Sequence, residues 1–386
     1  MKQDVYFDNA ATTRVFPEVA TLMTKIMELD YGNPSSRHIR GMEAENYVKT
    51  AREQIAGTLR VKPQEIIFTS GGTEADNLAL IGTALSRAKR GKHIISCNIE
   101  HAAVYKTLEF LEGQGFEITF LPVDEKGHVR AEALREAVRP DTILASIMYV
   151  NNEMGAIEPV AELSRMVKEI NPNCYFHTDA IQAYGKLKIR PKMEGIDMLS
   201  VSGHKLHGPK GVGFLYLNEK ARISPVIFGG GQQHDMRSGT ENVPGIAGMG
   251  LAAELYYRNH GDHVKKLVEI KDRLIERLLR MEGVKVNSEL SEASAPQIVS
   301  ASFSGVRAEV LLHALEEKGI YVSSGSACSS NHPAISGTLR AIGLPKELLD
   351  STLRFSFGLF NEVSEADRCA DAIEELLPVL RRFTRR

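Results

Sequence analysis

Lys205 is the first residue whose surroundings indicate chemistry. It lies in the segment Ser202–Gly211 (SGHKLHGPKG), between two apolar runs, 196–201 and 212–217, that we expect to be strands. A lysine crowded by backbone and by two histidines is suited to be an amine nucleophile that forms a Schiff base. An ordinary surface lysine is the alternative. The turn is not a phosphate-binding P-loop, because Pro209-Lys210-Gly211 stands where that motif needs Lys followed by Ser or Thr.

An acid upstream strengthens the chemical interpretation of Lys205. The run Tyr175–Ala180 reads as a short buried strand that ends in Asp179. In open α/β sheets, ligands bind beyond the carboxyl ends of the strands. An Asp that keeps a pyridine nitrogen protonated and a Lys that holds an aldehyde as an imine are what a pyridoxal phosphate site needs. A cap on a helix over Ala180–Tyr184 is the alternative role for Asp179.

A glycine-rich junction is the candidate phosphate site. The expected strand Glu65–Ser70 runs through Gly71-Gly72-Thr73-Glu74 into an expected helix, Ala75–Arg87. Free N–H groups and the positive end of the helix dipole suit a phosphate there. Simple capping of the helix by Thr73 or Ser70 is the alternative.

Two further residues differ from their surroundings in a way that suggests chemistry. Cys328 lies among Gly, Ser and Ala with no apolar run around it, so it is an exposed and reactive thiol or an inert loop cysteine. Arg354 occupies an inner position of the apolar strand expected at 352–357. Burying it unpaired would be costly, so it needs a carboxylate partner, either a structural Asp or Glu or the carboxylate of a substrate.

The order of the expected elements places these groups in an α/β protein. Strands and helices alternate from about residue 65 to 185, which predicts a mostly parallel sheet with helices on both faces. A long helical region over 247–281 is broken at Asn259-His260-Gly261. Beyond it we expect an α+β part with strands at 297–303, 320–323 and 352–357 and a closing helix at 365–377.

Composition excludes several classes of protein. The 386 residues are 43% hydrophobic and 25% charged with a net charge of −2, so no general attraction to nucleic acid or membrane is indicated. No apolar run reaches the roughly 18 residues of a membrane-spanning helix, and the N-terminus lacks a signal-peptide core. The four cysteines are widely spaced, which predicts a reducing, cytoplasmic location without disulfides.

Together these segments resemble the cysteine desulfurases, in the class V branch of the pyridoxal-phosphate enzymes of fold type I. The resemblance covers nearly the whole chain. The segments that carry it are 6–13 (YFDNAATT), 32–36 (GNPSS), 69–74 (TSGGTE), 100–101 (EH), 151–155 (NNEMG), 179–182 (DAIQ), 202–205 (SGHK), 236–240 (MRSGT), 323–328 (SSGSAC) and 353–356 (LRFS). Each is weakly specific alone, but in this order and spacing they are highly specific.

The resemblance implies a fold and a division into domains. We expect a mostly parallel seven-stranded sheet flanked by helices in a large domain that binds pyridoxal 5′-phosphate, residues 15–260. A smaller α+β domain, residues 1–14 and 261–386, is expected to carry a mobile loop with Cys328.

The resemblance also implies a role for each matching residue. Lys205, Cys328 and His101 are expected to be catalytic. Lys205 holds the cofactor and shuttles a proton, and Cys328 takes the sulfur. The other expected cofactor contacts are His101 on the ring, Asp179 at the pyridine nitrogen, Asn152 and Gln182 at the ring oxygen, Gly72, Thr73, Ser202 and His204 at the phosphate, and Thr240 from the other subunit of a homodimer. Arg354, helped by Asn33, is expected to clamp the substrate carboxylate, and no metal is expected.

The implied reaction converts L-cysteine to L-alanine and leaves a persulfide on Cys328. The expected partners are acceptor proteins for iron–sulfur cluster assembly or tRNA thiolation.

Two features depart from the family: the chain stops at Arg386 without the tail that binds a scaffold protein in some members, and Phe228 and Gln232 stand where histidines are common. Selenocysteine lyase or aminotransferase activity on the same fold, and a non-catalytic scaffold, are the rival interpretations. An aminotransferase needs no loop cysteine, and a scaffold would not need Lys205 and Cys328.

Overall fold

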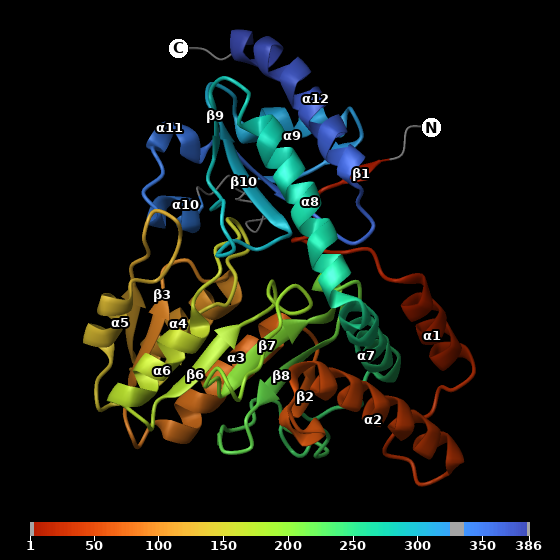
Figure 1. The fold of residues 1–386 in the computed structure, drawn as a ribbon. Helices are drawn as coiled ribbons and strands as arrows, with labels where there is room; N and C mark the ends of the chain where they lie inside the picture. Colours follow the sequence, from red (N-terminus) through yellow and green to blue (C-terminus); the bar gives the residue numbers. More distant parts are fainter. Residues whose placement is uncertain (1–3, 325–335, 384–386) are drawn as a thin grey trace.

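The computed structural model describes residues 4–324 and 336–383. Cys328 therefore lies outside the described residues. The described chain forms one sheet of seven strands, one of four and one of two, with helices packed around them (Figure 1). No helix in the described ranges is long and apolar enough to cross a membrane.

The seven-stranded sheet is mostly parallel, which confirms the prediction. Its strands run in the spatial order β2 (Ile66–Thr69), β8 (Gly213–Leu217), β7 (Met198–Ser202), β6 (Tyr175–Asp179), β5 (Thr142–Ser146), β3 (His93–Cys97) and β4 (Glu117–Leu121). Only β8 is antiparallel to its neighbours, β2 and β7. Most of these strands are buried along their whole length, as expected for a sheet that is covered on both faces.

Alternate residues of each strand pack against different helices. In β8, Phe214 and Tyr216 join the apolar cluster of α2 (Ile39–Leu59), α6 (Val160–Ile170) and α7 (Val243–Arg258), whereas Leu215 joins that of α3 (Gly72–Arg87) and α4 (Ala102–Gly113). The period of two along each strand thus divides the core into two layers. Two further helices, α1 (Pro17–Glu28) and α5 (Ala131–Ala137), also contribute to the first layer.

The C-terminal part is built around an antiparallel sheet. Its order is β12 (Ser323–Ser324), β13 (Thr352–Ser356), β10 (Ile298–Phe303) and β9 (Val284–Val286). The long helices α8 (His260–Leu278) and α12 (Val363–Leu380) lie side by side against it, and α9 (Ala308–Glu316) adds to the same core (Figure 1). Two short helices, α10 (Gly337–Ala341) and α11 (Lys346–Leu349), precede β13.

The N-terminus packs with this C-terminal part. Strand β1 (Val5–Tyr6) pairs in parallel with β11 (Ile320–Tyr321), and Val5 and Phe7 are fully buried in the C-terminal apolar cluster. Such packing is compatible with the expected small domain, whose exact boundaries stay a prediction. The single strand expected at 320–323 is wrong, because β11 and β12 are separate strands that belong to two different sheets.

Candidate functional site

Lys205 lies in a tight turn directly after a central strand. Strand β7 ends at Ser202, and a single 3₁₀ turn, Gly203–Lys205, follows. The half-buried Lys205 points back to the N-terminal segment, where its Nζ donates hydrogen bonds to the carbonyls of Ala10 (2.6 Å) and Ala11 (2.7 Å). Its position in a strand-to-strand turn is therefore as predicted, and it is not a freely solvated surface lysine.

The N-terminal segment also holds the main chain of this turn. Thr13 Oγ1 donates to the His204 carbonyl (2.9 Å) and accepts from the His207 amide (2.8 Å). Burial, reinforced by the charge of Lys205, lowers the pKa of His204 to about 4, so that this ring is neutral at physiological pH. Its Nδ1 lies 3.2 Å from Thr12 Oγ1. The turn is thus fixed on both sides of Lys205.

Asp179 lies at the same edge of the sheet as Lys205. It is the last residue of β6, which neighbours β7, and its side chain is buried. Burial raises the pKa of Asp179, while the nearby His101 and Lys205 act in the opposite direction. Its Oδ1 accepts from the Ile181 amide (2.9 Å), but no helix follows at 180–184, so the alternative role of Asp179 as the cap of a helix there is wrong. A hydrogen-bonded turn occupies these residues instead.

Two more predicted cofactor residues lie near Asp179 and Lys205. His101 is the N-cap of α4, where its Nδ1 accepts from the Ala103 amide (3.1 Å), and its charge acts on Asp179. His101 therefore caps α4, and its expected contact with a cofactor ring stays a prediction. Gln182 Nε2 donates to the Ala10 carbonyl (3.0 Å), the same oxygen that Lys205 contacts.

At the candidate phosphate site, the helix begins earlier than predicted and packs closely against neighbouring turns. Helix α3 begins at Gly72, three residues earlier than predicted, and its N-cap is Gly71, which has no side chain to cap it. A Cβ atom on Gly72 would lie 2.1 Å from Ile181 Cδ1 and 3.5 Å from Ser202 Cβ. Glycine therefore lets the helix start pack closely against the turns that follow β6 and β7. Thr73 is exposed in the first turn of α3.

Arg354 has the carboxylate partner that its burial requires. It lies in the middle of β13 and is 8% exposed. Its Nη2 pairs with Asp8 Oδ1 (2.9 Å), and its Nη1 donates to the carbonyl of Asn152 (2.9 Å). The structure therefore joins Arg354 to the half-buried Asn152, a predicted cofactor residue. Asn33 and Thr240 are exposed on other loops, and in the described ranges neither makes a hydrogen bond to Lys205 or Arg354.

A buried polar cluster beneath Asp179 is not visible in the sequence. Asp76 on α3 is fully buried, and its Oδ1 lies 3.6 Å from His177 Nε2. Burial, followed by the charge of Asp179, raises the pKa of both Asp76 and Glu100. The burial of Asp76 carries no signal in the sequence, because an acid on a helix is usually exposed.

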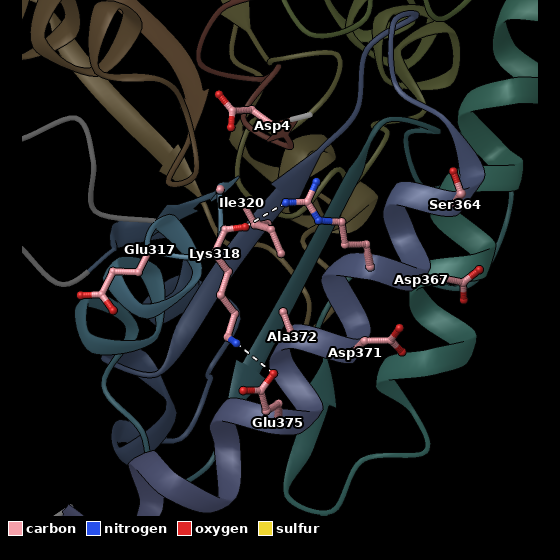
Figure 2. A pocket seen from close by; sticks show the side chains of 11 residues that line it. Asp4, Glu317, Lys318, Ile320, Ser364, Asp367, Asp371, Ala372 and Glu375 are labelled. Atoms are coloured by element: carbon pink, nitrogen blue, oxygen red, sulfur yellow. Dashed lines mark hydrogen bonds and ion pairs between the residues drawn. The ribbon is translucent and has the colours of Figure 1, made fainter. Parts of the chain in front are cut away.

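A charged hollow of about 760 Å³ lies elsewhere, between the N-terminal end of β11 and α12. Figure 2 shows contacts between some of the lining residues: Lys318 Nζ lies 2.8 Å from Glu375 Oε2, and Arg368 Nη2 donates to the Lys318 carbonyl (2.9 Å). None of the predicted site residues lines this hollow.

Comparison with known proteins agrees with this geometry. The model of the family "Aminotransferase class-V" matches residues 5–369. The chain is 44% identical to the cysteine desulfurase IscS of Methanosarcina thermophila, covering 98% of this chain and 93% of that protein. It is 45% identical to the putative cysteine desulfurase IscS 1 of Bacillus subtilis, covering 98% and 99%.

Solved structures give the same result. A NifS-like protein superimposes with a TM-score of 0.93 at 39% identity, over 98% of this chain and 100% of that one. A structure described as SspA in complex with cysteine superimposes with a TM-score of 0.81 at 35% identity, over 92% and 98%. The chain belongs to the class V aminotransferase family and, within it, to the cysteine desulfurases.

Proposed function

We propose that this protein is a pyridoxal-phosphate-dependent cysteine desulfurase that converts L-cysteine to L-alanine and transfers the sulfur to Cys328. The observation that carries the proposal is the juxtaposition at the carboxyl edge of the large sheet. Asp179 and Lys205 follow neighbouring strands there, and the charge of Lys205 acts on Asp179. An acid and an amine in this arrangement suit the two ends of a pyridoxal ring.

The residues present fit the cofactor. The close packing that Gly72 permits leaves the uncapped start of α3 beside Ser202, which is the donor set that a phosphate needs. Asp179 would hold the pyridine nitrogen and Lys205 the aldehyde carbon. The remaining contacts would come from His101, Asn152, Gln182, Thr73, His204 and, from a second subunit, Thr240.

When bound, pyridoxal phosphate supplies an electron sink for the α-carbon of an amino acid. The chain supplies positioning and proton transfer. Lys205 Nζ would take the α-proton of L-cysteine and return a proton as alanine forms. The carbonyls of Ala10 and Ala11 orient this amine in the structure, and the charge of Lys205 acts on Asp179.

Arg354 would bind the carboxylate of the substrate. Its guanidinium is already oriented by Asp8 and by the Asn152 carbonyl. Among the residues that the structure describes, each terminal nitrogen uses one N–H in these contacts, so one N–H on each can bind an incoming carboxylate. Asn33 would assist from its loop.

Cys328 would attack the sulfur of the bound substrate as a thiolate. A new S–S bond would form, the C–S bond of the substrate would break, and the sulfur would remain on Cys328 as a persulfide. Acceptor proteins of iron–sulfur cluster assembly or tRNA thiolation would then receive it. We further propose that the enzyme works in the cytoplasm as a homodimer.

The visible absorption spectrum of the purified protein, followed by an assay of sulfide and alanine with L-cysteine, tests the proposal. We expect a coloured band and equimolar products in the wild type. Cys328→Ser should keep the band and lose the sulfide, and Ser329→Ala, a small change in the neighbouring residue, is the matched control. A band without sulfide would favour transamination or lyase activity. A protein with no band even after addition of cofactor would contradict the proposal.

A further inference from the structure

Lys186 is a buried lysine between the two turns of the proposed cofactor site. It is 5% exposed and lies in the turn that follows Asp179, where its amide donates to the Ala183 carbonyl (3.0 Å). Its Nζ donates to the main-chain carbonyl of Lys205 and, more weakly, to that of Tyr184 (3.5 Å). One side chain therefore links the turn after β6 to the turn after β7.

The surroundings of Lys186 are unusual for a lysine. Its Nζ lies 5.8 Å from the centre of the Tyr256 ring, and no described carboxylate is within ion-pair distance. Burial, followed by the charge of Lys205, lowers the pKa of Lys186 to about 7. Burying a lysine without a counter-ion costs stability, so an apolar residue of similar length would be the better choice for the fold alone.

The position of Lys186 explains why an amine is present despite this cost. Asp179 and Lys205 must contact opposite ends of the same flat ring, so the distance between their two turns has to be fixed. The paired register of β6 and β7 ends at Asp179 and Ser200, and the last main-chain hydrogen bond beyond it runs from the Ala180 amide to the Ser200 carbonyl (3.0 Å). The contact from Lys186 to the Lys205 carbonyl continues the connection beyond the ends of the strands.

We propose that Lys186 is a positioning residue that fixes the main chain of Lys205 relative to the Asp179 turn through its hydrogen bond to the Lys205 carbonyl. The inference rests on the proposed function, in which Lys205 holds the cofactor. Lys186 itself does not touch substrate or cofactor in this proposal. Its contribution is to the orientation of the reactive amine.

The experiment compares Lys186→Met with the wild type. Methionine has a similar length but no donor, so the turn should lose its link while the core stays filled. After removal of the cofactor, pyridoxal phosphate is added back, and the growth of the visible band reports attachment to Lys205. We expect attachment and kcat to fall about tenfold, because small misplacements of a reacting group are costly, with an unchanged KM for L-cysteine. The thermal midpoint should stay the same or rise.

Lys271→Met is the matched control. Lys271 is also 5% exposed, and its Nζ likewise contacts carbonyls, those of Ser294 (3.3 Å) and Ala295 (3.1 Å), but it lies on α8. This variant should attach the cofactor at the wild-type rate. Lys186→Gln, which keeps a polar end on a shorter side chain, should show the same defect as Lys186→Met, so the test does not depend on one variant folding well.

Wild-type attachment and kcat in both Lys186 variants would overturn the inference. A fall in kcat that is accompanied by a lower thermal midpoint would also overturn the inference, because the two together indicate a merely structural role. A wild-type protein that shows no band would instead contradict the proposed function, so the two failures can be told apart.

Discussion

Two cations of the site, Lys205 and Arg354, reach the same N-terminal segment but are held in different ways. Lys205 Nζ contacts the neutral carbonyls of Ala10 and Ala11, whereas Arg354 pairs with the carboxylate of Asp8. The difference lies in these direct contacts, because the charge of Lys205 also acts on Asp179. Main-chain carbonyls orient the amine that is proposed to exchange protons, whereas a carboxylate orients a guanidinium that remains charged and has to recognise a carboxylate. The partner of each cation thus matches its proposed task.

Removing the reactive cation should have the largest effect. Lys205→Ala should abolish the visible band and lower the rate of alanine formation by on the order of 10³-fold, because Lys205 is the group proposed to move the α-proton. Lys210→Ala removes an exposed lysine from the same loop and should leave activity unchanged. Retention of the band in Lys205→Ala would show that another amine holds the cofactor.

Removing the recognition cation should mainly affect substrate binding. Arg354→Gln should raise the KM for L-cysteine about 100-fold, because a charge-assisted pair with the carboxylate is lost, while the absorption band remains. Steady-state kinetics and the spectrum of the same preparation give both values. Arg307→Gln, on an exposed arginine that pairs with Asp350, is the control. A KM that did not change would remove Arg354 from the substrate site.

The counter-ion of Arg354 should matter less than Arg354 itself. In Asp8→Asn the guanidinium keeps its contact with the Asn152 carbonyl but loses its charged partner. We expect the KM for L-cysteine to rise about tenfold with little change in kcat, because the guanidinium is less well oriented. If the KM fell instead, Asp8 would be a competitor of the substrate carboxylate, and the comparison between the two cations would have to be revised.

A buried acid outside the site should affect stability alone. Burial raises the pKa of Glu158 to about 8, and both of its carboxyl oxygens accept from the Val129 amide. The folded protein therefore binds more protons than the unfolded chain between the usual glutamate pKa and about pH 8, so stability should fall as the pH rises through this range. Denaturant unfolding of Glu158→Gln between pH 5 and 8 should show a weaker pH dependence than the wild type. An identical slope would mean that Glu158 does not titrate in this way.

Local patterns predicted much of this fold. The alternation of apolar strands and amphipathic helices between residues 65 and 185 is a short-range signal, and the parallel sheet follows from it. The break at Asn259–Gly261 likewise separates α7 from α8. The sequence left a short helix after Asp179 open as the alternative to a turn, because five residues are too few to show a helical period.

Contacts between segments that are distant in the chain could not be predicted from the sequence. Arg354 needed a carboxylate, but 346 positions separate it from Asp8, and any acid of the chain would have satisfied the argument. The split of residues 320–324 between two sheets also depends on pairing with β1 and β13. The burial of Asp76 and of Lys186 depends on how whole helices and strands pack. It could not be predicted from the residue types, because Asp and Lys are usually exposed.

The identity of the lysine that holds the cofactor is the most direct test. Borohydride reduction would fix pyridoxal phosphate to its lysine, and peptide mass spectrometry would locate the added mass. We expect one modified peptide, with the mass on Lys205. The mass on Lys186 or on another lysine would contradict both the proposed site and the positioning role of Lys186.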